Sequence, residues 1–234
     1  MRIAGLQKNS FVDYPGKIAA VVFTQGCNFD CYYCHNSKLI PRKNIEPLLP
    51  EGLVLNFLEE RKDFLDAVVI TGGEPTLQAA LTGFIEKIRE KGLAVKLDTN
   101  GTNPQLLEKL IEKGLLDYVA MDFKAPFSKY SSICGKHVEL KKIMQSIEIL
   151  LRGNCEYEFR TTYVSRLTKE DILEIAFTIR GANRYVLQQV RYDNILIERR
   201  KDFWEERAHP GAYLQETAEI VKEYVPNCFI RGLK

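Results

Sequence analysis

Hydrophobic residues along this chain follow two alternating patterns. Six apolar runs, rich in β-branched residues, have the length and composition of buried β-strands. Each run is followed by a stretch whose apolar residues recur every three or four positions, which is typical of a helix with one buried face. The predicted strands cover residues 18–25, 67–71, 94–99, 118–124, 158–164 and 185–190.

Capping residues and glycines mark the ends of the predicted helices. Asn103 and Pro104 can start a helix that stops at Gly114, because Asn caps free backbone amides and Pro suits the first helical position. Thr168 can cap another helix, which runs to Gly181. The predicted helices cover residues 53–65, 77–88, 104–111, 140–151, 168–179 and 215–225.

Repeated alternation of strand and helix predicts a parallel sheet covered by helices, either open or rolled into a closed or partial (β/α) barrel. In both architectures functional groups gather at the carboxyl ends of the strands. No repeat or long linker divides the chain, so we expect a single domain over residues 1–234. Its core covers about 17–190 and a C-terminal extension about 191–234, in which the highly charged residues 193–211 form a surface excursion.

Composition excludes several classes of protein. The 234 residues are 45% hydrophobic and carry a net charge of +2, which is enough apolar material for a core but no electrostatic footprint for nucleic acid. No apolar run approaches the ~20 residues of a membrane-spanning helix, and the N-terminus lacks the apolar block of a secretory signal. We therefore expect a cytoplasmic protein with neither a membrane nor a nucleic acid as its partner.

The cysteines carry the first chemical signal. Three of the six crowd into eight residues directly after the first predicted strand, and the other three are isolated. In a reducing compartment such a cluster is typical of metal binding or redox chemistry. No second tight set exists, so one metal centre is predicted and the isolated cysteines are expected to be bystanders. The cluster is Cys27, Cys31 and Cys34, and the isolated residues are Cys134, Cys155 and Cys228.

Four interpretations of the cluster remain open at this point. A zinc site needs a fourth ligand, and His35 is strained in that role because it adjoins Cys34. The segment from Cys31 to His35 also matches the haem-attachment pattern C-x-x-C-H, although this chain carries no export signal. Buried thiols gathered by chance do not account for the spacing. The fourth interpretation is a [4Fe-4S] cluster with one iron left open to a small molecule.

The spacing C-x3-C-x2-C, with Tyr33 before its last cysteine, resembles the signature of the radical S-adenosylmethionine (SAM) enzymes. The resemblance implies a single-domain, partial (β/α)6 barrel of the TIM type. It also implies that Cys27, Cys31 and Cys34 hold three irons of a [4Fe-4S] cluster while SAM completes the fourth. Reductive cleavage of SAM then gives methionine and a 5′-deoxyadenosyl radical.

Gly72, Gly73, Glu74 and Pro75 follow the second predicted strand. Alone they can be a plain strand-to-helix turn, because glycines permit a tight backbone path and Pro suits the first helical position. In the radical SAM family a segment of this kind lies along the methionine part of SAM. The resemblance therefore implies that these residues bind the cofactor, with Glu74 near its ammonium group.

Charged residues end the next two predicted strands. Asp98 and Asn100 resemble the Asp-Thr-Asn-Gly of glycyl-radical activating enzymes, although Asn-Gly is also a common turn. Asp122 and Lys124 share one face of their strand, so they can form a structural ion pair. The resemblance instead implies that Asp98 and Asp122 lie near the carboxylate of SAM, directly or through a monovalent cation. It places Lys124 near substrate or cofactor.

Arg160, on the fifth predicted strand, can hold the carboxylate of SAM bidentately or can be an ordinary rim residue. After the sixth strand the activating enzymes can place a His near SAM, whereas this chain has Arg191 and Tyr192. That departure leaves any role of the sixth strand open.

His35 and Asn36, together with Phe-Val-Asp-Tyr-Pro-Gly at residues 11–16, resemble the activating proteins of anaerobic ribonucleoside-triphosphate reductase and, more loosely, of pyruvate formate-lyase. The resemblance implies a glycyl-radical enzyme as protein substrate and flavodoxin or ferredoxin as electron donor. His35 and Asn36 can also be plain loop-closing residues. Two alternatives remain: a radical SAM enzyme acting on a small molecule, such as a 7-carboxy-7-deazaguanine synthase, or a zinc-binding interaction module.

Overall fold

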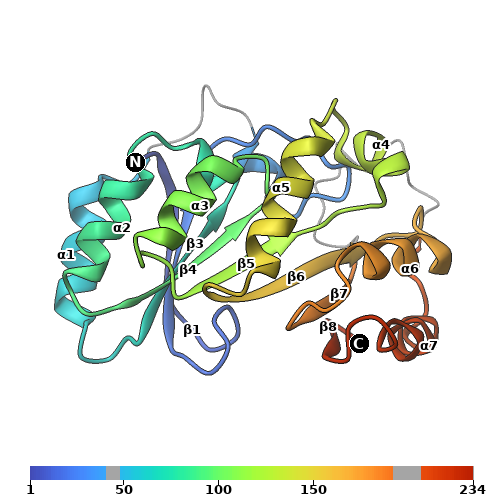
Figure 1. The fold of residues 1–234 in the computed structure, drawn as a ribbon. Coiled ribbons are helices and arrows are strands. Elements are labelled where there is room, and N and C mark those ends of the chain that lie inside the picture. Colours follow the sequence, from blue (N-terminus) through green and yellow to red (C-terminus); the bar gives the residue numbers. More distant parts are fainter. Residues whose placement is uncertain (41–47, 192–206, 234) are drawn as a thin grey trace.

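A computed structural model describes residues 1–40, 48–191 and 207–233. Within them, eight strands form one sheet whose spatial order is the order of the chain (Figure 1). The first strand runs antiparallel to the second, and every later neighbour pair is parallel. The strands are β1 (Ile3–Ser10), β2 (Ala19–Thr24), β3 (Ala67–Gly72), β4 (Ala94–Thr99), β5 (Tyr118–Asp122), β6 (Glu156–Tyr163), β7 (Tyr185–Gln189) and β8 (Cys228–Arg231).

The helices lie on the outer side of the sheet, each between two successive strands. Figure 1 shows α1, α2, α3 and α5 side by side over one face, with α6 and α7 continuing the layer around the curve. They are α1 (Glu51–Arg61), α2 (Leu81–Arg89), α3 (Pro104–Glu112), α4 (Tyr130–Cys134), α5 (Leu140–Leu151), α6 (Lys169–Thr178) and α7 (Gly211–Val221). Among the described residues, no helix is long and apolar enough to cross a membrane.

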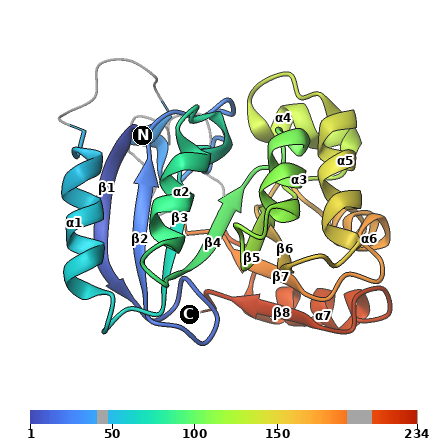
Figure 2. The same cartoon turned by 60° about the vertical axis from the view of Figure 1, so that its left-hand side comes forward.

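The sheet curls into a barrel that stays open. Figure 2 shows β1 and β8 at its two ends, and no strand pairing between them exists in the described part of the chain. The six parallel strands β2 to β7 are the six that the hydrophobic pattern predicts, each followed by a helix. The partial (β/α)6 barrel is therefore confirmed, with one strand added at each edge.

The two added strands were not predicted. β1 contains Gly5 and Lys8 and has no continuous apolar run, and β8 has only four residues. β8 nevertheless pairs in parallel with β7, and its Arg231 reaches the buried carboxylate of Glu158 at 3.5 Å. Part of the expected C-terminal extension thus belongs to the same sheet. Most of the expected surface excursion lies outside the described residues.

Local signals explain most helix ends. Asn103 accepts a hydrogen bond from the amide of Leu106 at the start of α3, and Thr168 forms a capping box with Asp171 at the start of α6, as predicted. The prediction for α2 was wrong at its beginning. Glu74 instead caps a short 3-10 helix, Pro75–Leu77, and α2 starts only at Leu81.

The inner face of the barrel has an apolar floor. Tyr14, from the loop between β1 and β2, packs its ring 5.7 Å from that of Tyr118. Small side chains on neighbouring strands, such as Ala67 and Ala120, leave room for these two rings. The floor closes the amino end of the barrel, so the open interior lies toward the carboxyl ends of the strands.

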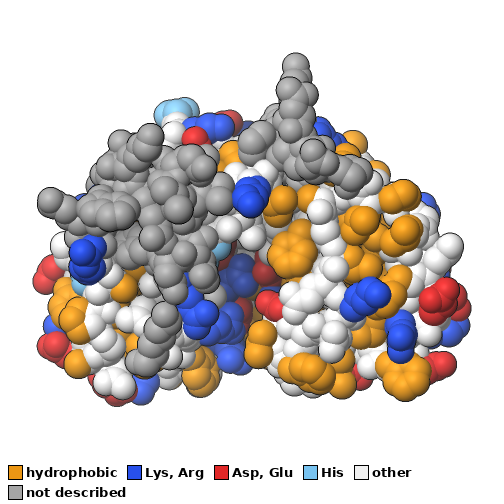
Figure 3. All heavy atoms as spheres, turned by 180° about the vertical axis from the view of Figure 1, so that it is seen from behind, with side chains coloured by type: hydrophobic (Ala, Val, Ile, Leu, Met, Phe, Trp, Pro, Cys, Tyr) orange, Lys and Arg blue, Asp and Glu red, His pale blue; other side chains and the backbone are white. Residues whose placement is uncertain are grey.

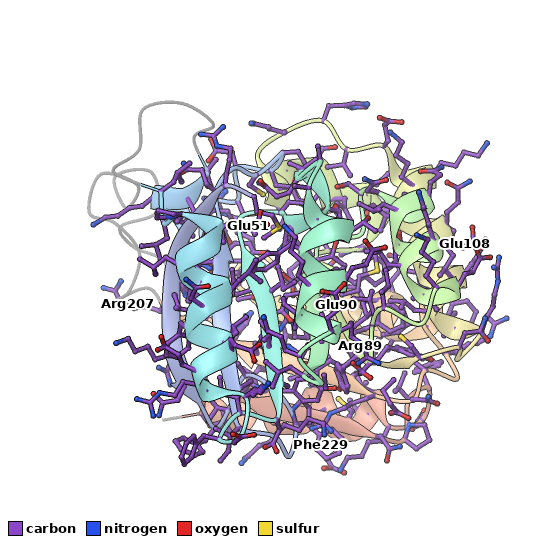
Figure 4. All side chains as sticks on the ribbon, turned by 90° about the vertical axis from the view of Figure 1, so that its left-hand side faces the viewer. Glu51, Arg89, Glu90, Glu108, Arg207 and Phe229 are labelled. Atoms are coloured by element: carbon purple, nitrogen blue, oxygen red, sulfur yellow. The ribbon has the colours of Figure 1, made fainter. Side chains whose placement is uncertain are left out.

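Ion pairs on the outside join neighbouring helices. Figure 4 shows Glu51, Arg89 and Glu108 on the outer layer; Glu51 pairs with Lys87 at 2.8 Å and Glu108 with Arg152 at 2.6 Å. Exposed pairs of this kind contribute roughly 0–1 kcal/mol each. Packing of the helices on the sheet therefore supplies most of the stability of this layer.

Candidate active site

A cavity of about 350 Å³ opens at the carboxyl ends of the strands. Figure 3 shows, from behind, a hollow in the molecule in which basic and acidic side chains gather beside apolar ones. Residues predicted from separate segments of the sequence thus meet in one place, although Pro75 is buried without lining the cavity. The predicted residues that line it are Cys27, Cys31, Tyr33, Cys34, Gly72, Gly73, Glu74, Asp98, Asn100, Asp122, Lys124 and Arg160.

The cysteine loop leaves β2 and is held by its own backbone. The amide of Gly26 donates to the carbonyl of Leu39 at 2.7 Å, and the amide of Cys34 donates to the carbonyl of Cys31 at 3.1 Å. Cys31 is buried, whereas Cys27 and Cys34 are partly exposed. Burial raises the pKa of Cys27 to about 12 in the protein without metal. Binding of iron by this thiol would therefore release a proton.

The three cysteines fit a cluster better than a single ion. In the described ranges, no three His, Cys, Asp or Glu side chains are grouped so that they could hold one metal ion. Cys27, Cys31 and Cys34 nevertheless line the same cavity wall. A [4Fe-4S] cluster takes each thiolate on a different iron, so its ligands stand farther apart than those of a single ion. The soft thiolate donors also match iron in such clusters.

Cys134 is not the isolated residue that its sequence position suggested. It is fully buried at the end of α4, and its carbonyl accepts a hydrogen bond from the amide of Asp30 at 2.9 Å. The nearby Cys134 thiol, together with Lys124, outweighs the effect of burial and lowers the pKa of Cys31 to about 7. Helix α4 brings this residue against the cysteine loop, and its role as a bystander to the metal centre stays a prediction. Cys155 and Cys228 lie at the amino-terminal ends of β6 and β8, away from that loop.

The glycine pair after β3 lies directly against the cysteine loop. The amide of Glu74 donates to the carbonyl of Gly26 at 2.8 Å. A Cβ atom added to Gly73 would stand 2.2 Å from the same carbonyl oxygen, so no larger residue fits there without displacing the loop. The contact keeps two neighbouring strand ends in a fixed relation.

Glu74 is buried and accepts four hydrogen bonds. Its carboxylate accepts hydrogen bonds from the amide and the hydroxyl of Thr76 at 3.1 and 2.6 Å. It also accepts from the hydroxyl of Thr99 at 2.8 Å and from the amide of Asn100 at 2.7 Å. Burial raises the pKa of Glu74, and these donors counteract the rise. The carboxylate thus joins the end of β3 to the end of β4.

Asn100 connects the end of β4 to the cysteine loop. Its amide nitrogen donates to the side-chain oxygen of Asn28 at 2.8 Å, and Asn28 in turn donates to the hydroxyl of Thr102 at 2.8 Å. Sequence reasoning missed Asn28, which lies between two cysteines and carries no signal of its own. The amide-to-amide contact fixes the start of the cysteine loop.

A row of alternating charges crosses the inner wall. Lys96 binds Asp98 at 2.5 Å, and Arg160 binds both Asp98 at 3.2 Å and Asp122 at 2.9 Å. Asp122 also binds Lys124 at 3.1 Å, as the shared strand face predicted. The sequence did not single out Lys96, although its side chain is only 2% exposed. Arg160 is therefore an interior residue with two carboxylate partners, not a rim residue.

Each charge in this row stabilises its neighbour. Burial opposes ionisation of Asp122, but Arg160 and Lys124 outweigh it and lower the pKa of Asp122 to about 2. Burial likewise opposes the charge of Lys124, yet Asp122 raises the pKa of Lys124 well above its ordinary value. Asp122 and Lys124 therefore stay charged near neutral pH. The wall can orient a ligand that carries both a positive and a negative group.

His35 and Asn36 make loop-closing hydrogen bonds. The ring nitrogen Nε2 of His35 lies 3.1 Å from the carbonyl oxygen of Arg191, just after β7. Asn36 donates to the carbonyl of Gly72 at 3.4 Å. The cysteine loop is thereby tied to strand ends on both sides of the open barrel. Tyr192 lies outside the described residues.

Comparison with known proteins places the chain in a family. A profile described as the radical SAM superfamily matches residues 21–179. The chain belongs to the radical SAM superfamily. The match begins in β2 and ends just after α6, so it includes the cysteine loop and most strand ends that line the cavity.

Several proteins resemble this radical SAM chain. It is 37% identical over 240 residues to a Methanocaldococcus jannaschii protein provisionally named a glycyl-radical enzyme activating enzyme, covering 99% of this chain and 96% of that protein. A GTP 3′,8-cyclase of Helicobacter pylori is 29% identical over 170 residues, or 71% of this chain and 52% of its own. A 7-carboxy-7-deazaguanine synthase of Methanopyrus kandleri is 36% identical over 132 residues, which cover 48% of this chain and 52% of that protein.

A solved structure supports the architecture. Streptococcus suis SuiB, in a structure bound to S-adenosylmethionine, superposes with a TM-score of 0.68 at 17% identity. The superposition covers 89% of this chain and 48% of SuiB. At that level of identity the likeness concerns the fold, and it agrees with the curled, open sheet described above.

Proposed function

We propose that this radical SAM protein generates a glycyl radical on a partner enzyme, and that this partner is anaerobic ribonucleoside-triphosphate reductase. The observation that carries the proposal is the near end-to-end similarity to the M. jannaschii protein provisionally named a glycyl-radical enzyme activating enzyme. The other two relatives match only about half of their own length. The site supports the same chemistry, because three cysteines and a charged wall share one cavity.

The proposed roles follow from position in the cavity. Cys27, Cys31 and Cys34 would hold a single [4Fe-4S] cluster through three irons. When bound, the cluster supplies the electron that cleaves SAM, so that a 5′-deoxyadenosyl radical can remove a hydrogen atom from a glycine Cα. Within the chain, the buried Tyr33 would pack against the cofactor from the cysteine loop.

The remaining residues would bind and orient SAM. Gly72 and Gly73 line the cavity, and their lack of side chains lets their backbone pack directly against β2 and the cysteine loop, while Glu74 and Asn100 hold these strand ends in place. The charged wall of Asp98, Asp122, Lys124 and Arg160 would face the amino and carboxylate groups of SAM, directly or through a monovalent cation. Flavodoxin or ferredoxin would supply the electron.

The interior offers groups suited to an extended peptide. Thr162 on β6 and Gln188 on β7 line the cavity, and neither belongs to the charged row. Hydroxyl and amide side chains can pair with both the N–H and the C=O groups of a main chain. A glycine has no side chain to recognise, so main-chain contacts of this kind would position it.

The experiment combines cluster content with radical formation. Anaerobic reconstitution should give a brown protein with about four irons per chain, and each of Cys27→Ala, Cys31→Ala and Cys34→Ala should lose the cluster. Cys155→Ala is the matched control and should keep its iron. The reduced native protein, incubated with SAM and an anaerobic ribonucleotide reductase or a formate-lyase, should give the glycyl doublet in electron paramagnetic resonance. A colourless protein holding one zinc would refute the proposal.

A radical SAM enzyme acting on a small molecule is the second candidate. It is favoured by the matches to a GTP cyclase and to a deazaguanine synthase. Cleavage of SAM that never produces a glycyl doublet with any partner, yet accelerates when a purine nucleotide or a pterin is added, would support this candidate. Membership of the radical SAM superfamily removes the zinc-binding interaction module as an alternative.

A further inference from the structure

We propose that Cys134 is a positioning residue of the metal centre: its thiol donates a hydrogen bond to the sulfur of Cys31 and makes the bound cluster easier to reduce. The inference rests on the proposed [4Fe-4S] site and assigns to that site a fourth cysteine that is not a ligand. It explains why a residue so far away in sequence is packed against the cysteine loop.

The backbone holds Cys134 in this position. The amide of Asp30, the residue before Cys31, donates to the carbonyl of Cys134 at 2.9 Å. Helix α4 then ends at Gly135 in the left-handed conformation, with φ of 66°. A Cβ atom at Gly135 would stand 2.5 Å from the carbonyl oxygen of Asp30. The end of α4 and the middle of the cysteine loop are therefore in direct backbone contact.

The surroundings of the two sulfur atoms are dry. Cys134 is 0% exposed and Cys31 is 5% exposed. Tyr130, also fully buried, packs edge-on against the ring of Phe29, with 6.3 Å between ring centres. Two aromatic side chains, one from α4 and one from the cysteine loop, thus shield this contact from water.

The chemistry of the pair gives the hydrogen bond a direction. A ligating cysteine is a thiolate and can only accept, whereas a thiol buried in apolar surroundings keeps its proton and can donate. The backbone contact between Asp30 and Cys134 sets this thiol beside the buried Cys31. A donor to a ligating sulfur stabilises the more negative, reduced cluster, which raises its reduction potential. Burial of both residues strengthens the effect.

The test compares side chains that differ in their ability to donate. Cys134→Ala and Cys134→Val remove the donor, with Val closer to Cys in volume, and Cys134→Ser retains an O–H group. Cys228→Ala removes a buried cysteine of β8 and is the matched control. Each protein is reconstituted anaerobically, and its iron content and midpoint potential are measured, the latter by titration followed with electron paramagnetic resonance.

The expected result is full iron content in all four variants. The midpoint potential should become more negative in Cys134→Ala and Cys134→Val, and should stay close to the native value in Cys134→Ser and Cys228→Ala. Loss of iron from both apolar variants while Cys228→Ala keeps its iron would overturn the inference, because Cys134 would then be a ligand or part of the scaffold. Unchanged potentials in the apolar variants would overturn it too. If the native protein binds no cluster, the proposed function itself fails.

Discussion

Glu74 joins two strands through a single carboxylate. Its four hydrogen-bond donors come from the turn after β3 and from the end of β4, and the side chain is only 1% exposed. Such a group can support the cavity wall and still face a ligand, because a carboxylate has about four acceptor positions spread over two oxygens. Its structural role follows from these four hydrogen bonds, and its role toward SAM is testable.

Replacement Glu74→Gln should reduce the free energy of unfolding by about 1–3 kcal/mol, because the new amide group faces donors that have lost their acceptor. Urea unfolding measures the change. Glu90→Gln, at an exposed position after α2, is the matched control and should stay within about 0.5 kcal/mol of the native protein.

The same carboxylate should matter for the cofactor. We expect Glu74→Ala to keep its iron but to bind SAM more weakly, measured by calorimetry on the anaerobically reconstituted protein. Unaltered affinity would mean that Glu74 serves only the turn.

Single residues differed in how well the sequence revealed them. The cysteine cluster and the glycine pair, which line one cavity, could be singled out because their spacing is local. Lys96 was hidden inside an apolar strand, where a buried charge is not expected until its partner Asp98 is seen beside it. The place of Cys134 beside the cysteine loop could not be predicted, because its contact with Asp30 joins distant segments of the chain and no local pattern records such a contact.

At the scale of elements, the contact between Gly73 and the cysteine loop can be tested with a pair of glycines. We expect Gly73→Ala to destabilise the protein and weaken SAM binding, since the added Cβ would stand 2.2 Å from the carbonyl oxygen of Gly26. Gly83→Ala meets nothing within 4 Å on α2 and should stabilise the fold by roughly 0.5–1 kcal/mol. Thermal unfolding and SAM titration measure both variants. Equal behaviour of the two would show that the loop moves aside freely.

Strands and helices were predictable where at least one of their faces is buried. The strands β2 to β7 lie between two layers and so read as apolar runs. β1 is an edge strand whose second half is exposed, and β8 is short, so neither offers a clear pattern. The start of α2 was misplaced because Glu74 and Pro75 favour a separate short turn, which the periodic apolar residues alone do not reveal.

For the whole molecule, the charged wall makes the free energy of unfolding depend on pH. The pKa of Asp122 is about 2 in the folded protein and about 3.9 in an unfolded chain. The resulting stabilisation is fully present above the unfolded value and is lost as the pH falls toward the folded one. We expect the free energy of unfolding to decrease from about pH 5 to about pH 3.

Asp122→Asn should make that decrease smaller, because it removes one of the carboxylates responsible. Urea unfolding at the two pH values gives the difference directly, whatever the stability of the variant at neutral pH. Asp63→Asn, at an exposed position, should leave the decrease unchanged. An identical acid dependence in Asp122→Asn and the native protein would contradict the assignment.

The whole architecture followed from the alternation of strands and helices, but its openness did not. Nothing in the pattern shows whether the last strand meets the first, because that depends on the curvature of the sheet. Likewise, the near-zero net charge says little about the interior, where opposite charges cancel in the sum while they build a polar wall.

The match between strand order and chain order also bears on how this protein is made. Each new strand can join the edge of a sheet that already exists, so the barrel can grow as the chain leaves the ribosome. The cysteine loop emerges with the second strand, whereas Cys134 follows about a hundred residues later. During that interval the three thiols are not yet enclosed, and they are most exposed to oxidation.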